Sequence, residues 1–313
     1  MARYTNLDGT TPDKGIGDIL RWQVDRLTSG KKKVGREFVT PRRANDGTAL
    51  ASSEPSLTWI GHSTFVQRIG GRLIATDPIW SEVIQSVIKR RAAPGVPFEQ
   101  MPKLDVVTIS HAHYDHFDLP TLREIGNDTI YVVPENNGEL LRSQNFAQVV
   151  ELGWWDTFRV PGPLNVSITL VPAQHWSMRT PWDRNKRLWG GYVIRGPEGT
   201  SFHAGDTAFS AEMFADIGRR FAQLGGIDWA MLPIGAYDPT WFMQEQHMGP
   251  EEAGRAFELL GAKNLCAMHW GTFDLTDEPP AEPPERLRAW WKERGLDPSR
   301  LWIFDIGETR ALR

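Results

Sequence analysis

Short apolar runs bounded by glycine, proline or polar residues recur along the chain from residue 57 onward and predict β-strands. The first three span 57–60, 64–69 and 72–76, and Gly70-Gly71 suits a tight hairpin turn because glycine tolerates positive φ. Later runs predict strands at 106–109, 130–133, 166–171, 188–194, 201–204, 229–232, 265–268 and 301–304. We therefore expect antiparallel hairpins at the start of a strand-rich domain.

Helix-like segments separate the later strands. Asp118 is placed to cap a helix that begins with Leu119-Pro120, since proline is tolerated in the first helical turn. Further helices are expected near 139–142, over 211–224 and 250–260, and after a proline-rich loop at 279–284. Hairpins followed by β/α alternation predict a layered α/β protein with helices outside its sheets.

The first 55 residues mix glycine, proline, threonine and charged residues with only short apolar pieces. We interpret residues 1–55 as an N-terminal extension packed on the main domain, and residues 56–313 as one domain. The segment 80–91 places Trp80, Ile84 and Ile88 at helical spacing and ends in Lys89, Arg90 and Arg91. Such a segment is expected either to touch a lipid surface or to pack as a lid over a cleft.

Composition narrows the classes of function. The net charge of −4 is too mild to indicate a nucleic-acid partner. The chain lacks an apolar run long enough for a membrane span, and its start does not resemble a signal peptide, so we expect a cytoplasmic protein. Because Cys266 is the single cysteine, an intrachain disulfide is excluded.

The strongest chemical signal follows the strand expected at 106–109. Three imidazoles and a carboxylate lie within six residues there: His111, His113, Asp115 and His116. Single candidates follow other expected strands, namely His175, Asp206 and His269. Imidazole nitrogen and carboxylate oxygen are the usual ligands of catalytic zinc, and strand ends that converge on one rim would form a metal cleft. Seven ligands suffice for two ions if Asp206 bridges them.

The spacing His111-x-His113-x-Asp115-His116, followed by His175, Asp206 and His269, resembles the metallo-β-lactamase superfamily. Further motifs resemble its N-acyl-phosphatidylethanolamine-hydrolysing phospholipase D branch, among them Trp59-Ile60-Gly61-His62, Thr76-Asp77-Pro78, Gln174-His175-Trp176 and Gln246-His247. The resemblance implies a four-layer αβ/βα sandwich and two zinc ions (Zn²⁺), with manganese or iron as alternatives. It also implies hydrolysis of a phosphodiester in a small-molecule or lipid substrate.

The same resemblance assigns roles to individual residues. The first ion would be held by His111, His113 and His175, and the second by Asp115, His116 and His269, with Asp206 shared. Asp77 and His247 would orient ligands and support catalysis. Apart from the resemblance, we expect Asp115 also to orient the nucleophile or to take its proton. Substrate would be contacted by Tyr114, Gln246 and Trp176.

Two further histidines stand near these motifs. His62 is expected either to orient a ligand or to serve in packing. His203 lies on an expected strand, where side chains alternate between faces, so it should point away from Asp206 and be structural.

Three alternatives stay open at this stage. The same metal site would also open a lactone or a small ester. A related protein without catalytic activity would only bind a small molecule. Loss of activity usually removes a metal-binding residue first, and here the set of metal-binding residues is complete. An amidohydrolase barrel shares the His-x-His pattern but fits the Asp-His extension poorly. The oligomeric state is not indicated by the sequence.

Overall fold

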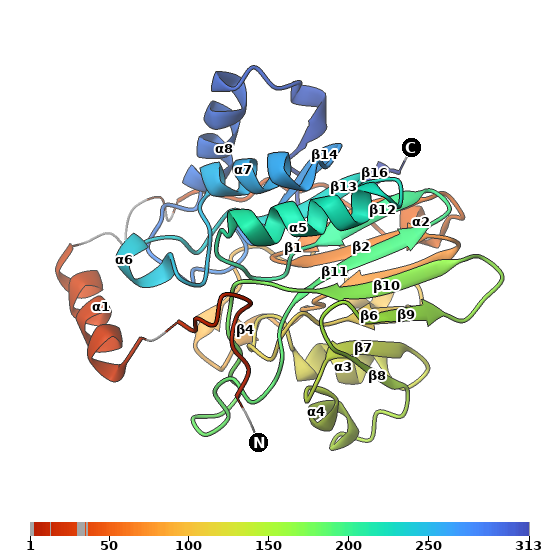
Figure 1. Cartoon of the computed structure of the whole chain (residues 1–313), viewed down its shortest axis with the longest axis horizontal. Coiled ribbons are helices and arrows are strands. Elements are labelled where there is room, and N and C mark those ends of the chain that lie inside the picture. Colours follow the sequence, from red (N-terminus) through yellow and green to blue (C-terminus); the bar gives the residue numbers. More distant parts are fainter. Residues whose placement is uncertain (1–2, 13, 30–34, 36, 313) are drawn as a thin grey trace.

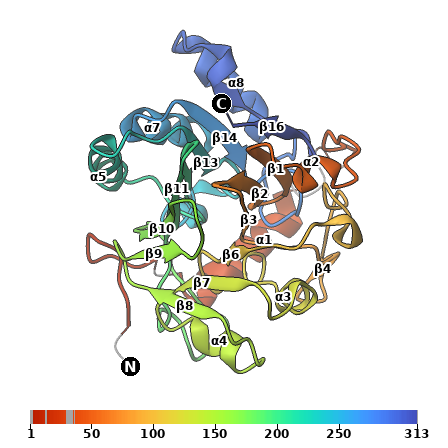
Figure 2. The same cartoon turned by 90° about the vertical axis from the view of Figure 1, so that its right-hand side faces the viewer.

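The computed structural model describes residues 3–12, 14–29, 35 and 37–312. Two seven-stranded mixed sheets pack face to face, and helices cover the outer face of each (Figures 1 and 2). This is the four-layer αβ/βα sandwich of the metallo-β-lactamase fold, as expected. It excludes the amidohydrolase barrel, because that fold closes a single parallel sheet on itself.

The first sheet has the order β16-β1-β2-β3-β6-β7-β8. Its strands are β1 (Ser56–Gly61), β2 (Thr64–Ile69), β3 (Arg72–Thr76), β6 (Val106–Thr108), β7 (Ile130–Pro134), β8 (Val149–Leu152) and β16 (Thr309–Ala311). The expected hairpin turn is present, with φ of 55° at Gly70 and 68° at Gly71. β8 and β16 were not predicted, because both are short and only partly buried.

The second sheet has the order β15-β14-β13-β12-β11-β10-β9. Its strands are β9 (Thr157–Val160), β10 (Val166–Val171), β11 (Gly191–Gly196), β12 (Gly199–His203), β13 (Trp229–Pro233), β14 (Asn264–Met268) and β15 (Leu301–Trp302). The strand predicted at 188–194 begins three residues later than expected, at Gly191. Leu188 and Trp189 are buried in the preceding loop, which is why their apolar character suggested a strand.

The outer helices follow the predicted pattern. The first sheet is covered by α3 (Leu119–Ile125) and α4 (Gly138–Arg142), and the second by α5 (Ala211–Ala222), α7 (Pro250–Leu260) and α8 (Glu282–Glu293). Asp118 stands at the cap position of α3, but its carboxylate accepts from the hydroxyls of Ser81 and Thr121 instead of a backbone N–H. α8 begins inside the proline-rich stretch expected as a loop, because proline fits a first turn.

The segment 80–91 is not a helix, and this expectation was wrong. It forms a small hairpin of β4 (Val83–Ile84) and β5 (Ile88–Lys89), with positive φ at Gln85 and Ser86 in the turn. Apolar residues one and four positions apart also occur in a short strand–turn–strand unit. The spacing therefore does not distinguish such a hairpin from a helix. Ile84 packs with Ile79 and Phe273, which makes the hairpin part of the protein body.

The N-terminal segment contacts the body at several points. Tyr4 donates its backbone N–H to Asn185 O and its hydroxyl to Glu135. Farther along, α1 (Ile16–Ser29) lies beside α6 (Thr240–Met243) at the left of Figure 1. A further short helix is α2 (Thr48–Ala51). Lys31, Lys32 and Lys33 form a basic run that the sequence predicts to be a solvated arm, and these residues lie outside the described ones. The domain boundary at residue 55 stays a prediction.

Strand direction explains how distant residues meet. β1, β3 and β6 run the same way in the first sheet, as do β10, β12 and β14 in the second. Each of these strands ends just before a candidate residue of the motifs. The carboxyl ends of parallel strands meet at one edge, where ligands usually bind in α/β sheets. The topology therefore gathers the motif residues at one end of the sandwich.

Candidate metal centre

Three imidazoles form the first group of donor atoms. His111 and His113 come from the loop after β6, and His175 from the loop after β10. Nε2 of His111 lies 2.8 Å from Nδ1 of His113, and Nε2 of His175 lies 3.4 Å from the same atom. Two ligands of one tetrahedral zinc ion are separated by about 3.3 Å, so this spacing suits a shared ion.

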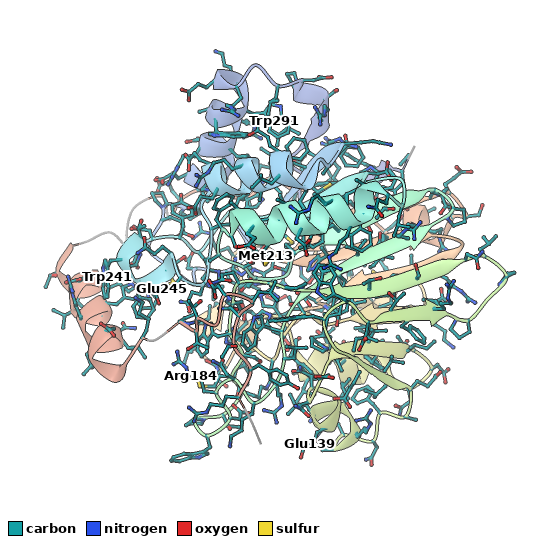
Figure 3. The ribbon with its side chains drawn as sticks, in the orientation of Figure 1. Glu139, Arg184, Met213, Trp241, Glu245 and Trp291 are labelled. Carbon is teal, nitrogen blue, oxygen red and sulfur yellow. The ribbon has the colours of Figure 1, made fainter. Side chains whose placement is uncertain are left out.

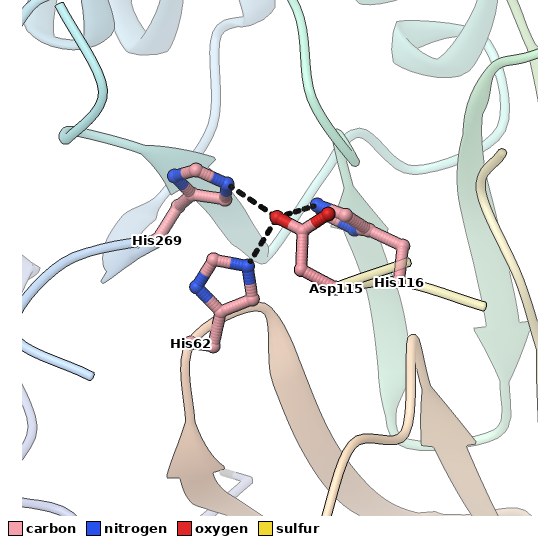
Figure 4. Close-up of side chains that lie close together, drawn as sticks. All are labelled: His62, Asp115, His116 and His269. Carbon is pink, nitrogen blue, oxygen red and sulfur yellow. Dashed lines mark hydrogen bonds and ion pairs between the residues drawn. The ribbon is translucent and has the colours of Figure 1, made fainter. Parts of the chain in front are cut away.

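The second group combines two imidazoles with carboxylates. Nε2 of His116 lies 3.2 Å from Asp206 Oδ2, and Nε2 of His269 lies 3.1 Å from Asp206 Oδ1. Asp115 Oδ2 lies 3.6 Å from His116 Nε2 and 3.8 Å from His269 Nε2 (Figure 4). Asp206 also approaches His111 and His175 at 4.0 Å each, so its carboxylate stands between the two groups.

Unpartnered buried atoms test whether metal fits this arrangement. A buried polar atom without a partner costs roughly 1–3 kcal/mol, so each calls for an explanation. Within the described part of the chain, five such atoms cluster here: His113 Nε2, His116 Nε2, Asp206 Oδ1, His247 Nδ1 and His269 Nε2. His269 Nε2 and Asp206 Oδ1 are close yet not aligned as a hydrogen bond. Nε2 of His116, Nε2 of His269 and Oδ1 of Asp206 converge without a hydrogen-bond partner, as a metal site requires, and these residues fit an ion.

The protonation of the first group and of the carboxylates suits metal binding, whereas an ion in the second group would have to displace protons. Burial, reinforced by nearby imidazoles, lowers the pKa of His111 well below its usual range and that of His175 to about 3. These rings are therefore neutral and have a free nitrogen. Burial alone would raise the pKa of Asp115 and Asp206, but the charge of His116 outweighs it and holds both well below the usual value. Both carboxylates are thus ionised, as ligands must be. Burial would lower the pKa of His116 and His269, but the charge of Asp206 outweighs it and raises that of His116 well above its usual range and that of His269 to about 9.

Asp77 contacts one of the donor residues, His116, on the side away from the cavity. It follows β3 at a positive φ of 41°, and its Oδ2 accepts a hydrogen bond from Nδ1–H of His116 at 2.7 Å. Its two oxygens also accept from the backbone N–H and hydroxyl of Ser110. This carboxylate–histidine pair fixes the His116 ring so that Nε2 faces the second group. Asp77 thus orients a ligand and does not line the cavity.

His247 occupies a different place from the one its motif implied. Instead of bonding the far nitrogen of a ligand, it lines the cavity, with Nδ1 3.9 Å from Asp206 Oδ2. The orienting contact to His175 comes from its neighbour, because the backbone oxygen of Gln246 accepts from Nδ1–H of His175 at 2.8 Å. The Gln246 side chain lines the cavity.

Two aromatic residues predicted to contact substrate lie at the cavity, and one predicted structural histidine lies away from it. Tyr114 and Trp176 both line the cavity, and Trp176 packs edge-on against His113 with ring centroids 4.6 Å apart. The Tyr114 hydroxyl donates to the backbone oxygen of Arg179. His203 bonds away from the centre, to Ser63 O at 2.8 Å, in agreement with the structural role expected for it.

Sequence reasoning missed three contributors that come from outside the motifs. Asn6 Oδ1 accepts the backbone N–H of His175 at 3.0 Å and so supports the ligand loop. Arg179 donates to the backbone oxygens of Ala112 and Phe117 and thereby braces the loop after β6. Trp22 of α1 forms part of the cavity wall. Local pattern carried no signal for these roles, since each depends on a distant segment of the chain.

A cavity of about 500 Å³ opens over the centre. The cavity floor includes His113, Asp115, Asp206, His247 and His269. The cavity walls are largely apolar and come from the β4–β5 hairpin, the loop after β10, α6 and α1, through Ile84, Ile88, Trp176, Met178, Phe242, Met243 and Trp22. A deep polar floor below apolar walls is the usual form of a small-molecule or lipid site.

Residues 72–270 match the family described as "Beta-lactamase superfamily domain". The chain belongs to this superfamily. It is 33% identical over 266 residues to N-acyl-phosphatidylethanolamine-hydrolyzing phospholipase D 1 of Caenorhabditis elegans, an alignment that covers 80% of this chain and 74% of the relative. It is 31% identical to a UPF0173 metal-dependent hydrolase of Methanopyrus kandleri, over 81% of this chain and 98% of that protein.

Solved structures agree with this membership. The metallo hydrolase Igni18 of Ignicoccus hospitalis superposes with a TM-score of 0.61 at 26% identity, over 83% of this chain and 98% of Igni18. The chain is therefore a metal-dependent hydrolase of the beta-lactamase superfamily. Among the described residues, the helices are all too short or too polar to cross a membrane.

Proposed function

We propose that the protein is a binuclear zinc-dependent phosphodiesterase that cleaves a phospholipid-like substrate in the manner of a phospholipase D. The observation that carries this proposal is the placement of Asp206 between two groups of donors, at the floor of an apolar cavity. His111, His113 and His175 would hold one ion, Asp115, His116 and His269 the other, and Asp206 both. The name of the C. elegans relative supports the same substrate class.

Two metal ions supply Lewis acidity to a phosphoryl oxygen and activate water for in-line displacement. The side chains around the centre orient the metal-binding residues and the substrate. Asp77 and Gln246 fix the rings of His116 and His175 that they contact, and Asp115 offers an ionised oxygen within the second group. His247 has an unpartnered Nδ1 that faces the cavity, and we assign to it the contact with the reacting phosphoryl group.

The walls above the centre suit acyl chains. Ile84 and Ile88 come from the hairpin, whereas Phe242 comes from α6 and stacks on Trp22 with ring centroids 5.0 Å apart. Burial of a methylene group contributes about 0.8 kcal/mol, so several methylenes in this cavity would dominate binding. Arg179 is the one lysine or arginine that lines the cavity among the described residues, so the walls do not favour a highly anionic substrate.

Exposed apolar side chains stand on the same segments that line this cavity. Leu20 and Leu27 of α1 are 61% and 85% exposed, Val87 at the hairpin tip is 74% exposed, and Trp182 in the loop after β10 is 81% exposed. Each belongs to a segment that also lines the cavity, through Trp22, Ile88 and Pro181 respectively. Apolar and tryptophan side chains insert at the membrane interface, so we place a peripheral lipid contact here. A cytoplasmic location stays a prediction.

The decisive experiment follows the reaction products in water enriched in ¹⁸O. Protein of measured zinc content would be incubated with diacyl phosphodiesters, lactones and small esters, and the products identified by mass spectrometry. We expect phosphatidic acid that carries one ¹⁸O, because attack at phosphorus releases the headgroup alcohol and leaves the water oxygen on phosphate. Asp206→Ala should be inactive, whereas Asp216→Ala on the surface of α5 serves as a matched control. Turnover of lactones or esters alone would overturn the proposal.

A further inference from the structure

His62 stands at the turn between β1 and β2, in a conformation that its neighbours impose. Its φ of 54° lies in the left-handed region, which residues other than glycine rarely adopt. Its backbone N–H donates to Thr272 Oγ1 at 2.7 Å, and its backbone oxygen accepts from the N–H of His269 at 3.0 Å, a contact that joins the two sheets. The same oxygen also accepts from Nε1–H of Trp59. A strained residue that is held from several sides in this way is a candidate for a functional role.

The side chain of His62 points at the second group of donors (Figure 4). Its Nε2 lies 3.0 Å from Oδ2 of Asp115, the same oxygen that approaches His116 and His269. Its ring also packs against the His269 ring, with centroids 4.2 Å apart. His62 therefore contacts three expected ligands of the second ion: Asp115 through a hydrogen bond, His269 through its ring and its backbone, and His116 through its ring.

His62 has to be distinguished from a metal ligand, because its donor atom lies within 4.8 Å of those of Asp115, His116 and His269. Across the described residues, Asp206 comes within 4.0 Å of imidazole nitrogens of His111, His116, His175, His247 and His269, and His62 is not among them. The Nε2 atoms of His116 and His269 are unpartnered, whereas Nε2 of His62 has Asp115 as its partner. A nitrogen that donates its proton to a carboxylate has no lone pair left for an ion.

We propose that His62 is a positioning residue for the second metal ion, an inference that rests on the proposed binuclear centre. Its Nε2–H occupies one lone pair of Asp115 Oδ2 and leaves the other directed at His116 and His269. The ring and the backbone of His62 hold His269 at the same time. Within the described part of the chain, the His62 ring packs against His116, His269 and Phe273 and against none of the first group, so its loss should act on the second ion.

Stepwise metal binding tests this role without any need for activity. Metal-free wild type and His62→Phe would be titrated with Zn²⁺ in competition with a chromophoric chelator, and with Co²⁺ to record the ligand-field spectrum. We expect two binding steps in the wild type. In His62→Phe one step should weaken by about 10–100-fold, the usual effect of losing a group that orients a ligand, while the other step keeps its affinity.

Two further variants separate hydrogen bonding from packing. His62→Gln keeps an N–H donor and should recover part of the lost affinity. Phe273→Leu removes the edge-on contact with the His62 ring, 5.3 Å between centroids, but leaves the hydrogen bond to Asp115, so both steps should persist. Circular dichroism of the metal-free proteins checks folding. If His62→Phe does not fold, His62→Asn replaces it, since its shorter amide falls short of Asp115.

The outcomes are distinguishable. A single binding step in the wild type overturns the binuclear centre itself, and with it the second ion that His62 would serve. Two steps of unchanged affinity in His62→Phe overturn only the role of His62 and leave it a packing residue. An equal weakening of both steps also overturns the proposal, because it shows a general effect on the loop after β6.

Discussion

Asp206 illustrates at the scale of one residue how much depends on a single side chain. It follows β12, is 4% exposed, and places one oxygen near His116 and the other near His269. Its Oδ1 has no hydrogen-bond partner among the described residues. A buried carboxylate is costly unless positive charge compensates it, and metal ions are the natural source of that charge here.

We therefore expect Asp206→Ala to reduce the bound zinc from about two ions per chain to one or fewer, because it removes the carboxylate shared by both groups. Elemental analysis after gel filtration measures the content directly. Asp216→Ala is the control, since Asp216 pairs with Arg219 and Arg220 on the surface of α5, away from the centre. Two ions retained in Asp206→Ala would show that the carboxylate does not bridge.

His247 and His116 should respond differently to truncation. His116→Ala empties a donor position and should abolish turnover together with metal binding at the second group. His247→Ala should keep its metal and lose activity by about 100–1,000-fold, the usual effect of removing one group that stabilises the reacting oxygen, because His247 lines the cavity beside the donors. Metal content and kcat are measured on the same preparations. Wild-type kinetics in His247→Ala would contradict the contact with substrate assigned to it.

The β4–β5 hairpin decides the shape of the cavity at the scale of an element. Ile84 and Ile88 face the cavity, whereas Val87 at the tip of the turn is exposed. A helix with the same residues would have set all of them on one face. The hairpin instead directs two residues to the cavity wall and one to the exposed tip. Acyl-chain binding in the cavity and lipid contact at the surface can therefore be tested on neighbouring residues.

Replacing Ile84 and Ile88 by serine should flatten the dependence of kcat/KM on acyl length. In the wild type, each buried methylene should raise kcat/KM by about fourfold, the equivalent of about 0.8 kcal/mol. A series of phosphodiesters that differ only in acyl length provides the measurement. Val87→Ser is the matched control and should keep the wild-type slope. A flat series in the wild type would argue against an acyl-chain cavity.

A second element, α1, is anchored to the body through one buried carboxylate. Asp277 accepts from Trp22 Nε1–H at 2.6 Å and forms an ion pair with Arg26 at 2.5 Å. Arg21 lies over Trp241, and Lys14 pairs with Glu245. Figure 3 shows Trp241 and Glu245 next to α1. The contacts to Asp277 keep Trp22 in the cavity wall.

Asp277→Ala should release α1 and open the cavity, because hydrogen bonds to charged groups contribute about 1.5–3 kcal/mol each. Hydrogen exchange of the α1 amides, followed by mass spectrometry, should accelerate by roughly tenfold or more. Asp274→Ala is the control, since Asp274 pairs with Arg91 and not with α1. Unchanged exchange in Asp277→Ala would show that α1 is held by other contacts.

At the scale of the whole molecule, the centre lies between the two sheets and connects them. Its residues come from the ends of strands in both sheets, so bound metal links the two halves of the sandwich. Ligands that bind only the folded state stabilise it in proportion to their occupancy. Metal removal should therefore lower the stability of the entire fold and not only abolish activity.

A strong chelator should lower Tm by about 5–10 °C, and added zinc should restore it. This estimate combines about 2.7 kcal/mol for a ligand at one hundred times its Kd with about 2–4 °C per kcal/mol for a large domain. Differential scanning calorimetry measures the shift. In Asp206→Ala, the chelator should have a smaller effect than in the wild type. An identical Tm with and without chelator would contradict the coupling of metal to the fold.

The sequence by itself predicted a layered α/β protein and the candidate donor residues, and its resemblance to a known family implied the four-layer arrangement. Strand periodicity is a local property, and the loop after β6 carries His111, His113, Asp115 and His116 within six residues, so both are readable without tertiary contacts. Strand direction then implied that His175, Asp206 and His269 would meet them. Their convergence follows from topology, since the carboxyl ends of strands that run the same way share an edge.

Only the tertiary structure decided which neighbours orient these donors and what walls the cavity. The hydrogen bond from His62 to Asp115 spans 53 residues of sequence, and the one from Trp22 to Asp277 spans 255. Such contacts depend on how separate elements pack, and a single residue in a local pattern carries no record of its distant partner. The helix predicted for the segment 80–91 was wrong for the same reason. Its turn geometry and its packing against the body overrode the helical spacing of its apolar residues.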